Sequence, residues 1–381
     1  MPISAILFSA VKQKSNRPKN MALSLFRKAP QFWERRGPTS LLLWPLSWLY
    51  GCILKIRKLI QDLDLFKAKP APVPIIIVGN IRVGGTGKTP IVIALAEQLS
   101  QLGWKPGIIS RGYGSSSQTS PLLVKSDSDP TFVGDEPVLI AKKTGDQFPL
   151  WVFPKRHKSI QCLLKHSPDV NVIISDDGLQ HRGLIRWPAR EGGRDVEFVV
   201  RDDRGEGNRF LLPAGPLREP ATRERDATLL NETQEQQKSG VLDEYFLGRR
   251  SFHLSSRLGT PYQLIDLSNT QTLEQIAEQF LPQNMTLIAG LGNPQRFFSD
   301  LIKRGVTGKE IPLPDHATYT PEFFSAIKTQ CILMTEKDAV KCTNILDERI
   351  WVVPMTLRLP DNLMDWLQSI LQRPDPHRYT L

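Results

Sequence analysis

Cysteine is scarce in this sequence, and no metal-binding spacing of cysteines is present. The 381 residues contain four cysteines, and no two of them form a C-x-x-C pair. Four cysteines are too few for a disulfide-stapled fold, which favours a reducing compartment and ordinary buried or half-buried thiols. Internal repeats are also missing. The fractions of charged residues (23%) and apolar residues (40%) are typical of a chain that buries a core. They exclude a disordered chain and a protein with several membrane spans.

Acidic residues are nearly absent from the first 70 residues. This segment holds 13 Lys and Arg against 3 Asp and Glu, a net charge of +10, whereas the remaining residues hold 36 of each and are neutral. A nucleic-acid-binding groove would spread its positive charge over a folded domain, so no nucleic-acid partner is expected. A basic end beside apolar residues indicates contact with an anionic membrane surface. No obligate protein partner is evident.

No apolar run reaches the roughly 20 residues that a membrane-spanning helix needs. The main candidate is Leu41–Leu54, which contains Trp44, Trp48 and Tyr50 and has basic residues on both sides. Aromatic residues of this kind prefer the headgroup boundary, and flanking cations favour a helix in the interface of an anionic membrane. One alternative is a buried core helix. A signal peptide is the other, which the distance from Met1 and the missing cleavage site disfavour.

A glycine-rich loop stands between a predicted strand and a predicted helix. The strand is Ile75–Asn80, and the helix follows Pro90 and ends at Gly103. This order is that of a P-loop, in which backbone amides and a helix N-terminus hold phosphate groups. The pattern G-x-x-x-x-G-K-[ST] is incomplete, because Arg82 stands where its first glycine would be. The predicted nucleotide-binding residues are Gly84, Gly85, Thr86, Gly87, Lys88 and Thr89.

The same loop and a second strand predict a magnesium site. Lys88 can reach the β- and γ-phosphates of a nucleoside triphosphate, and the Thr89 hydroxyl can bind Mg²⁺. The predicted strand Asp169–Ser175 runs directly into Asp176 and Asp177, whose carboxylates can hold the metal directly or through water. An acidic turn that only caps a strand is the plainer alternative, and the pairing with a P-loop favours the metal site.

Further predicted strands alternate with helical stretches. They lie at Ile108–Ser110, Val196–Val200, Leu287–Leu291, Ile332–Met334 and Ile350–Val353. This alternation is typical of an α/β fold with a P-loop NTPase-like, mostly parallel sheet and helices on both faces. The polar stretch Asn231–Gly240 predicts a surface segment and a domain boundary. The expected segments are a basic extension (1–37), a membrane-associated helical segment (38–69), a nucleotide-binding core (70–235) and a smaller C-terminal α/β domain (241–381).

Residues outside the P-loop must bind the acceptor of a transferred phosphate. Polar groups at predicted strand ends or in adjacent loops are the candidates, and each alone is a weak signal, because a lone Asp or His in a loop is usually just solvated. These candidates are Arg111, Tyr113, Asp135, Glu136, Asp176, Asp177, Gln180, His181, Asp315 and His316.

The sequence closely resembles the tetraacyldisaccharide 4'-kinases, the lipid A 4'-kinases of Gram-negative bacteria. The combination of GGTGKTP, DDGLQH and MTEKDAVKC is highly specific, and the motifs follow the family order. They are PLSWLYG (Pro45–Gly51), VGN…GGTGKTP (Val78–Pro90), SRGYG (Ser110–Gly114), GDEP (Gly134–Pro137), DDGLQH (Asp176–His181), LPAGPLRE (Leu212–Glu219), RFF (Arg296–Phe298), DH (Asp315-His316) and MTEKDAVKC (Met334–Cys342).

The resemblance implies a reaction and a location. The family is ATP-dependent and transfers the γ-phosphate to the 4'-hydroxyl of a tetraacylated glucosamine disaccharide 1-phosphate in lipid A and lipopolysaccharide biosynthesis. It works at the cytoplasmic face of the bacterial inner membrane. That location agrees with the separate interpretation of the basic, apolar N-terminal segment.

The resemblance also implies roles for single residues. Asp135 is the expected base, which takes the proton of the 4'-hydroxyl, and Asp315 and His316 form a pair that orients or tunes it. Lys88 and the metal ligands keep the roles given above. The substrate-binding candidates are Arg111, Tyr113, Glu136, Arg156, Gln180 and His181.

Three positions depart from the family pattern. The stretch Arg182–Gly193 is longer than expected and is interpreted as a lid insertion or a species-specific loop. Arg201 stands where an apolar residue is expected, and Asn293 stands where the family has His. The alternative function is a P-loop GTPase or metallochaperone-type nucleotide switch at the membrane, which the missing N-K-x-D motif disfavours. A membrane-binding protein with a vestigial nucleotide site is disfavoured by the intact Lys88, Thr89 and Asp176-Asp177.

Overall fold

The computed structural model describes residues 31–62, 70–112, 119–181, 183–231, 250–315, 317–342 and 344–374. Its contacts divide the chain into two compact units. Among the described residues, the smaller unit is Ser256–Thr356, and the larger unit contains the residues before and after it. The chain crosses between the units at β9 (Ser255–Leu258) and β15 (Met355–Arg358), which form a two-stranded sheet.

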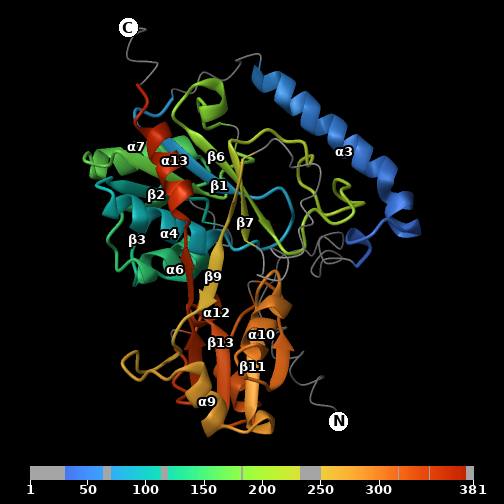
Figure 1. Ribbon diagram of the computed structural model, residues 1–381, viewed down its shortest axis with the longest axis vertical. Coiled ribbons are helices and arrows are strands. Elements are labelled where there is room, and N and C mark those ends of the chain that lie inside the picture. Colours follow the sequence, from blue (N-terminus) through green and yellow to red (C-terminus); the bar gives the residue numbers. More distant parts are fainter. Residues whose placement is uncertain are drawn as a thin grey trace. The chain divides into compact units, whose positions relative to one another are not determined.

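The larger unit is built on an eight-stranded sheet (Figure 1). The strand order is β3-β4-β2-β5-β1-β6-β7-β8, and each neighbouring pair is parallel except β3 and β4. The mostly parallel α/β fold expected from the sequence is therefore confirmed. The strands are β1 (Ile75–Gly79), β2 (Pro106–Ser110), β3 (Leu122–Val124), β4 (Leu150–Val152), β5 (Val172–Asp176), β6 (Val196–Asp202), β7 (Ala227–Asn231) and β8 (Ser251–His253).

The central strands bring two loops together. All five residues of β1 are buried, as are all five of β5, which is typical of parallel strands that are covered on both faces. The two strands are neighbours, and Val78 of β1 pairs with Asp176 of β5. The P-loop after β1 and the acidic residues after β5 therefore leave the same edge of the sheet side by side.

Helices cover both faces of this sheet. On one face, Ile160 and Leu163 of α7 pack with Ile75 and Ile77 of β1. Side chains alternate between the faces of a strand, so Phe198, whose register partner is Val78, lies on the other face, where it contacts Trp366 of α13 at a ring-centroid distance of 6.0 Å. The helices are α4 (Lys88–Gln101), α5 (Pro130–Val133), α6 (Asp135–Lys143), α7 (Arg156–His166) and α13 (Asp361–Leu371), with short 3-10 helices η1 (Gln31–Trp33) and η2 (Ala189–Glu191).

The smaller unit has a five-stranded sheet of its own. The order is β10-β14-β13-β11-β12, with only β10 and β14 antiparallel, and an apolar cluster lies on each face. Its elements are β10 (Tyr262–Gln263), α9 (Leu273–Gln279), η4 (Pro282–Asn284), β11 (Met285–Ala289), α10 (Pro294–Ile302), β12 (Lys309–Pro312), α11 (Pro321–Ser325), β13 (Cys331–Thr335), α12 (Glu336–Ala339) and β14 (Ile350–Val353).

The chain returns to the larger unit after the smaller one. Residues from Leu357 onward belong to the larger unit, because α13 packs Trp366 against Phe198 of β6 and Phe252 of β8. The sequence-based division into four segments places all of 241–381 in one C-terminal domain, so it does not include the return of the chain to the larger unit. Their boundaries stay a prediction.

Helix α3 (Pro38–Asp62), blue in Figure 1, exposes most of its large apolar side chains. By length and composition, Pro38–Arg57 could cross a membrane, and only 11% of that window is buried. A core helix would bury its apolar side chains, so the alternative that this segment is a core helix is wrong. The exposed large apolar residues of α3 are Leu41, Leu42, Trp44, Leu46, Trp48, Leu49, Ile53, Ile56, Leu59 and Ile60.

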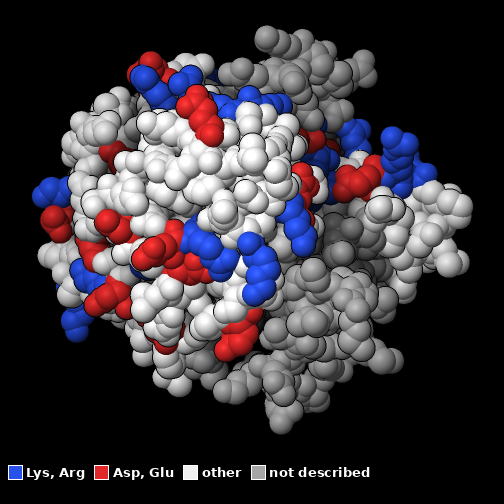
Figure 2. Space-filling model, turned by 90° about the horizontal axis from the view of Figure 1, so that it is seen from below, with Lys and Arg blue, Asp and Glu red and all other residues white. Residues whose placement is uncertain are grey.

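Charges of both signs are mixed on one face of the protein. Figure 2 shows one face, on which Lys and Arg side chains lie next to Asp and Glu side chains rather than in one large patch. This mixture agrees with the neutral charge balance of the chain after residue 70.

Candidate active site

The P-loop connects β1 to the N-terminus of α4. Gly84 and Gly87 have φ angles of 104° and 78°, which glycine adopts without the steric cost that other residues meet. Gly87 precedes the first residue of α4, Lys88, so the free amides of the first helical turn face the loop. A Cβ atom on Gly87 would stand 2.5 Å from Nδ2 of Asn231, so space as well as conformation requires glycine there.

Arg82 explains the missing first glycine of the P-loop pattern. Its side chain is buried, and its Nη1 atom donates to the carbonyl oxygens of Arg204 at 3.1 Å and Gly205 at 3.4 Å. Its Nη2 atom pairs with the carboxylate of Glu34, which precedes α3. Arg82 therefore ties the loop to two other segments of the larger unit, a role that glycine could not fill.

Lys88 lies between the P-loop strand and the acidic loop (Asp176–His181). Its Nζ atom is 3.2 Å from Oδ1 of Asn80 and 3.4 Å from Oδ1 of Asp177. The side-chain amide of Gln180 donates to the carbonyl oxygen of Asn80 at 3.0 Å, which adds a second link between the loops. The structure thus brings together the lysine and the acidic residues that the sequence singled out.

The two carboxylates of the acidic loop have different environments. Asp176 is buried and accepts a hydrogen bond from Ser110 on Oδ2 at 3.2 Å, while its Oδ1 atom has no hydrogen-bond partner among the described residues. Burial and the neighbouring Glu136 carboxylate raise the pKa of Asp176 to about 7, although Lys88 acts against them. Burial also acts to raise the pKa of Asp177, but the cations Lys88, Arg218 and Arg156 outweigh it and lower that pKa.

Arg156 lies behind the acidic loop. It is fully buried, and its Nη2 atom donates to the carbonyl oxygens of Asp176 at 2.6 Å and Asp177 at 3.2 Å. Burial lowers the pKa of Arg156 to about 10, so the guanidinium stays charged at neutral pH. These contacts support the acidic loop, and the substrate-binding role expected of Arg156 stays a prediction.

His181 ends the acidic loop as a neutral acceptor. Its Nε2 atom accepts a hydrogen bond from the backbone amide of Arg156 at 3.4 Å. Burial, together with the positive charges of Arg156 and Arg186, lowers the pKa of His181 to about 4. A neutral imidazole at pH 7 fits this acceptor role.

Asp135 and Glu136 begin α6, and both are half-buried. Acidic residues in the first turn interact favourably with the partial positive charge of a helix N-terminus. Since the Glu136 carboxylate raises the pKa of Asp176, the start of α6 lies within electrostatic reach of the acidic loop. The expected base, Asp135, is the residue before Glu136 on this helix.

The remaining candidates are distributed between the two units. Arg111 follows β2, is exposed, and its charge contributes to the lowered pKa values of Arg156 and His181. Asp315 belongs to the smaller unit, where its Oδ1 atom is 2.9 Å from Nζ of Lys337. Tyr113 and His316 lie outside the described residues.

Three side chains that sequence reasoning missed contact the same loops. Arg218 lies 3.6 Å from Oδ2 of Asp177, and Arg204 donates to the carbonyl oxygen of Gly85 at 2.6 Å. Asn231 donates to the carbonyl oxygen of Thr86 at 3.3 Å. The expected surface segment Asn231–Gly240 is wrong at its first residue, because Asn231 is the buried end of β7. For Arg218, its place in the motif LPAGPLRE was the sequence signal that could have identified it as a site residue.

A P-loop after β1 and paired carboxylates at the end of the adjacent β5 define a P-loop nucleotide-binding protein. Comparison with known proteins gives the particular family, because a model described as "Tetraacyldisaccharide-1-P 4'-kinase" matches residues 39–372. The chain belongs to this family, and it is a kinase of lipid A biosynthesis. The resemblance found in the sequence is confirmed, and the nucleotide-switch alternative falls away.

Relatives match over nearly the whole chain. The "Tetraacyldisaccharide 4'-kinase" of Polynucleobacter asymbioticus is 78% identical over 95% of this chain and all of its own length. That of Herminiimonas arsenicoxydans is 43% identical over 86% of this chain and 91% of its own. Among solved structures, LpxK from Aquifex aeolicus in complex with ATP is similar with a TM-score of 0.68 and 28% identity, covering 88% of this chain and 99% of that one.

Proposed function

We propose that this kinase transfers the γ-phosphate of ATP to the 4'-hydroxyl of a tetraacylated glucosamine disaccharide 1-phosphate at a membrane surface. The observation that carries the proposal is the position of Lys88, within 3.4 Å of both Asn80 after β1 and Asp177 after β5. This position puts a cation where phosphate oxygens held by the P-loop would lie. The relatives of the same family and the solved LpxK–ATP complex support the choice of nucleotide and acceptor.

The phosphates of ATP are held by backbone and cations. The amides of Gly84–Thr89 and the N-terminus of α4 bind the phosphate oxygens, and Lys88 neutralises the β- and γ-phosphates. Arg218, next to Asp177, supplies a second cation on the side of the acidic loop. A planar guanidinium matches the geometry of phosphate oxygens.

The acidic loop fits a magnesium ion. The Oδ1 atom of Asp176 is buried and lacks a hydrogen-bond partner among the described residues, and a divalent cation would satisfy it. Thr89, Asp176 and Asp177 would hold the ion, with phosphate oxygens and water as further ligands. The described residues contain no group of three or more His, Cys, Asp or Glu side chains around one point, which a P-loop site does not need. When bound, Mg²⁺ neutralises charge on the transferring phosphate.

Asp135 acts as the base for the acceptor hydroxyl. It accepts the proton of the 4'-hydroxyl while the oxygen attacks the γ-phosphorus, the bond to the β-phosphate breaks, and ADP leaves. Positioning and charge neutralisation supply most of the rate in such transfers, and proton abstraction supplies a smaller part. Asp315 and His316 remain the proposed pair that orients or tunes Asp135. Arg111, Tyr113, Glu136, Gln180 and His181 remain the proposed contacts of the sugar and its 1-phosphate.

Helix α3 brings the enzyme to its lipid acceptor. Its exposed leucine, isoleucine and tryptophan side chains lose contact with water when they enter a bilayer, and Lys55 and Arg57 favour anionic headgroups. A groove of about 880 Å³ lies between α3 and the segments after the acidic loop, with Trp44, Trp48 and Phe210 among its walls. We infer that the enzyme works at the cytoplasmic face of the bacterial inner membrane, where acyl chains of the acceptor stay near α3.

A transfer assay tests this function. The purified full chain is incubated in detergent with γ-labelled ATP, Mg²⁺ and the acylated disaccharide 1-phosphate. Label should move to the lipid, and removal of Mg²⁺ with a chelator should stop the transfer. Hydrolysis of ATP without labelled lipid would contradict the proposed acceptor, and transfer that persists in the chelator would contradict the metal.

A further inference from the structure

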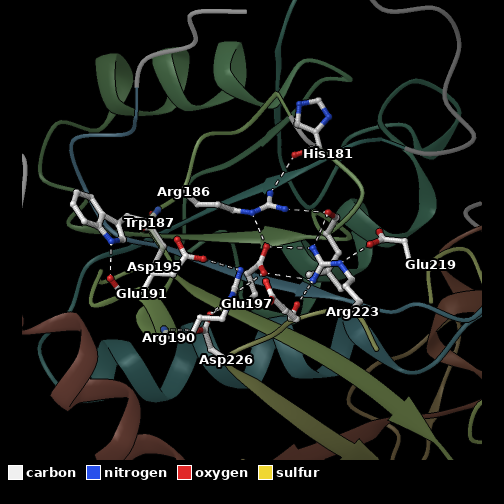
Figure 3. A network of polar contacts seen from close by, with 12 residues as sticks. His181, Arg186, Trp187, Arg190, Glu191, Asp195, Glu197, Glu219, Arg223 and Asp226 are labelled. Carbon is white, nitrogen blue, oxygen red and sulfur yellow. Dashed lines mark hydrogen bonds and ion pairs between the residues drawn. The ribbon is translucent and has the colours of Figure 1, made fainter. Parts of the chain in front are cut away.

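A buried carboxylate with three arginine partners lies next to the acidic loop (Figure 3). Glu197 is the second residue of β6, and its side chain is only 3% exposed. Its oxygens are 2.6 Å from Nε of Arg186, 3.0 Å from Nη1 of Arg190 and 3.3 Å from Nη2 of Arg223. We call these four residues the arginine cluster.

Within the arginine cluster, the positive guanidinium groups keep the buried carboxylate of Glu197 charged. Burial acts to raise the pKa of Glu197, but Arg186, Arg223 and Arg190 outweigh it and lower that pKa. The backbone amide of Glu197 donates to Asp226 at 2.7 Å, which fixes the position of the carboxylate on the strand. Glu197 is therefore a fixed anion around which the guanidinium groups are arranged.

Two of the three arginines also hold the acidic loop. Arg186 donates to the carbonyl oxygens of Leu179 and His181, each at 3.1 Å. Arg223 donates to the same carbonyl oxygen of Leu179 at 3.3 Å. These bonds reach the loop at two and four residues after Asp177, so they restrict where the acidic loop lies.

We propose that Glu197 is a positioning residue of the kinase, which sets the acidic loop against the P-loop through Arg186 and Arg223. The proposal rests on the proposed role of Asp176 and Asp177 as metal ligands. The cluster makes three hydrogen bonds to the acidic loop, so its ion pairs are coupled to the position of that loop.

The proposal also assigns a role to the longer loop 182–193. Two arginines of the cluster, Arg186 and Arg190, come from this stretch. Arg373, after α13, donates to the carbonyl oxygens of Ala189 and Gly193, each at 3.0 Å. With these attachments the described part of the stretch supports the acidic loop, a role beyond the two left open by the sequence, a lid insertion and a species-specific loop.

The test compares Arg186→Gln with a matched control, Arg190→Gln. Both variants remove one ion pair with Glu197, but among the described residues the Arg190 side chain pairs with Glu191, Glu197 and Asp226 and not with the acidic loop. We expect both variants to lower Tm. Only Arg186→Gln should lower kcat and raise the half-saturating Mg²⁺ concentration, each by about tenfold or more, as is usual when a residue behind a metal ligand is removed. The KM for ATP should change less than kcat.

Hydrogen exchange of the full chain without ligands gives a second readout. In Arg186→Gln the amides of residues 176–181 should exchange at least about tenfold faster, since the carbonyl bonds that order the loop are gone. In Arg190→Gln their exchange should match that of the unmodified chain. Equal effects of the two substitutions on kcat and on exchange would overturn the proposal and leave a purely structural cluster. Glu197→Gln, if it folds, should reproduce the kinetic effect of Arg186→Gln.

An Asp177→Asn variant separates this proposal from the proposed metal site. If Asp177→Asn leaves the Mg²⁺ dependence unchanged, the metal assignment fails, and hydrogen exchange still decides whether the arginine cluster orders the loop. If Asp177→Asn shifts the Mg²⁺ dependence and Arg186→Gln does not, the metal assignment holds and the positioning role of Glu197 is wrong.

Discussion

The acidic loop and helix α3 belong to the same unit, yet they meet opposite conditions. The acidic loop is buried or half-buried, with Arg156 and Arg186 on its carbonyl oxygens and Lys88 on a carboxylate. Along α3, by contrast, Leu42 is 80% exposed and Trp48 is 65% exposed. Buried polar groups require partners inside the protein, whereas exposed apolar groups on this scale indicate a partner outside it. The comparison separates the part of the enzyme that handles phosphate from the part that handles lipid.

The two regions are joined by one short segment. Ser47 of α3 donates to the carbonyl oxygen of Leu211 at 2.7 Å and accepts from the amide of Ala214 at 2.9 Å. Tyr50 of α3 donates to the carbonyl oxygen of Arg218 at 3.0 Å, and the amide of Arg218 donates to Ile81 beside the P-loop at 2.7 Å. The motif LPAGPLRE therefore lies between the helix and the nucleotide site, and substitutions at its two ends can separate their effects.

The largest effect should come from Asp135→Asn, which removes the base and keeps the shape. We expect kcat to fall by about 10²- to 10⁴-fold, the usual contribution of a positioned general base. Binding of ATP should stay close to normal, because Asp135 begins α6 and is no part of the P-loop. Steady-state kinetics and nucleotide titration measure the two quantities. A kcat within about threefold of normal would remove Asp135 from the role of base.

Thr89→Ala should affect the nucleotide and Mg²⁺ site and leave membrane binding unchanged. The substitution removes the hydroxyl proposed to bind Mg²⁺, so the half-saturating Mg²⁺ concentration should rise by about tenfold or more. Binding of the enzyme to vesicles should not change, since Thr89 is buried in the first turn of α4. An unchanged Mg²⁺ dependence would contradict the ligand role.

Much of the site was predictable because its signals are local. The P-loop and the pair Asp176-Asp177 each occupy a few consecutive residues next to a strand, and the parallel sheet places strand ends together. The supporting contacts were not predictable in this way. Arg82 meets Glu34, and Arg204 meets Gly85, across 48 and 119 residues, with no periodic pattern to reveal either pair. The same holds for the link between Arg186 and the acidic loop, which depends on how the loop folds back.

The lipid side is tested by charged substitutions on α3. Leu42→Glu combined with Leu49→Glu should weaken binding to anionic vesicles by about tenfold or more, since burial of each large apolar side chain contributes about 1.5–3 kcal/mol. Activity on detergent-solubilised acceptor should fall much less, because neither side chain lines the groove beside α3. Co-sedimentation with vesicles and the transfer assay measure the two effects.

A matched control for α3 lies in the smaller unit. Leu346 is 90% exposed, so Leu346→Glu changes a comparable apolar surface away from the helix. This variant should bind vesicles like the unmodified chain. If it weakens binding as much as the α3 variant, the membrane contact is not specific to α3, and the contrast between the two regions is wrong.

The smallest effect is expected from Tyr50→Phe, which removes only the hydroxyl that joins α3 to Arg218. One hydrogen bond contributes about 1 kcal/mol, so the free energy of unfolding should fall by about that amount. Because Arg218 also lies 3.6 Å from Asp177, kcat should fall by a few-fold, about the factor of five that 1 kcal/mol represents. Denaturant unfolding and steady-state kinetics are the measurements.

Ser47→Ala is the control that gives the Tyr50 result its meaning. It removes two hydrogen bonds between α3 and the same segment, but at Leu211 and Ala214, which lie away from Arg218 in the chain. Its loss of stability should equal or exceed that of Tyr50→Phe, with kcat unchanged. If kcat follows stability in both variants, α3 contributes only to folding. If kcat falls only in Tyr50→Phe, the helix that contacts lipid also sets the position of a cation at the phosphate site.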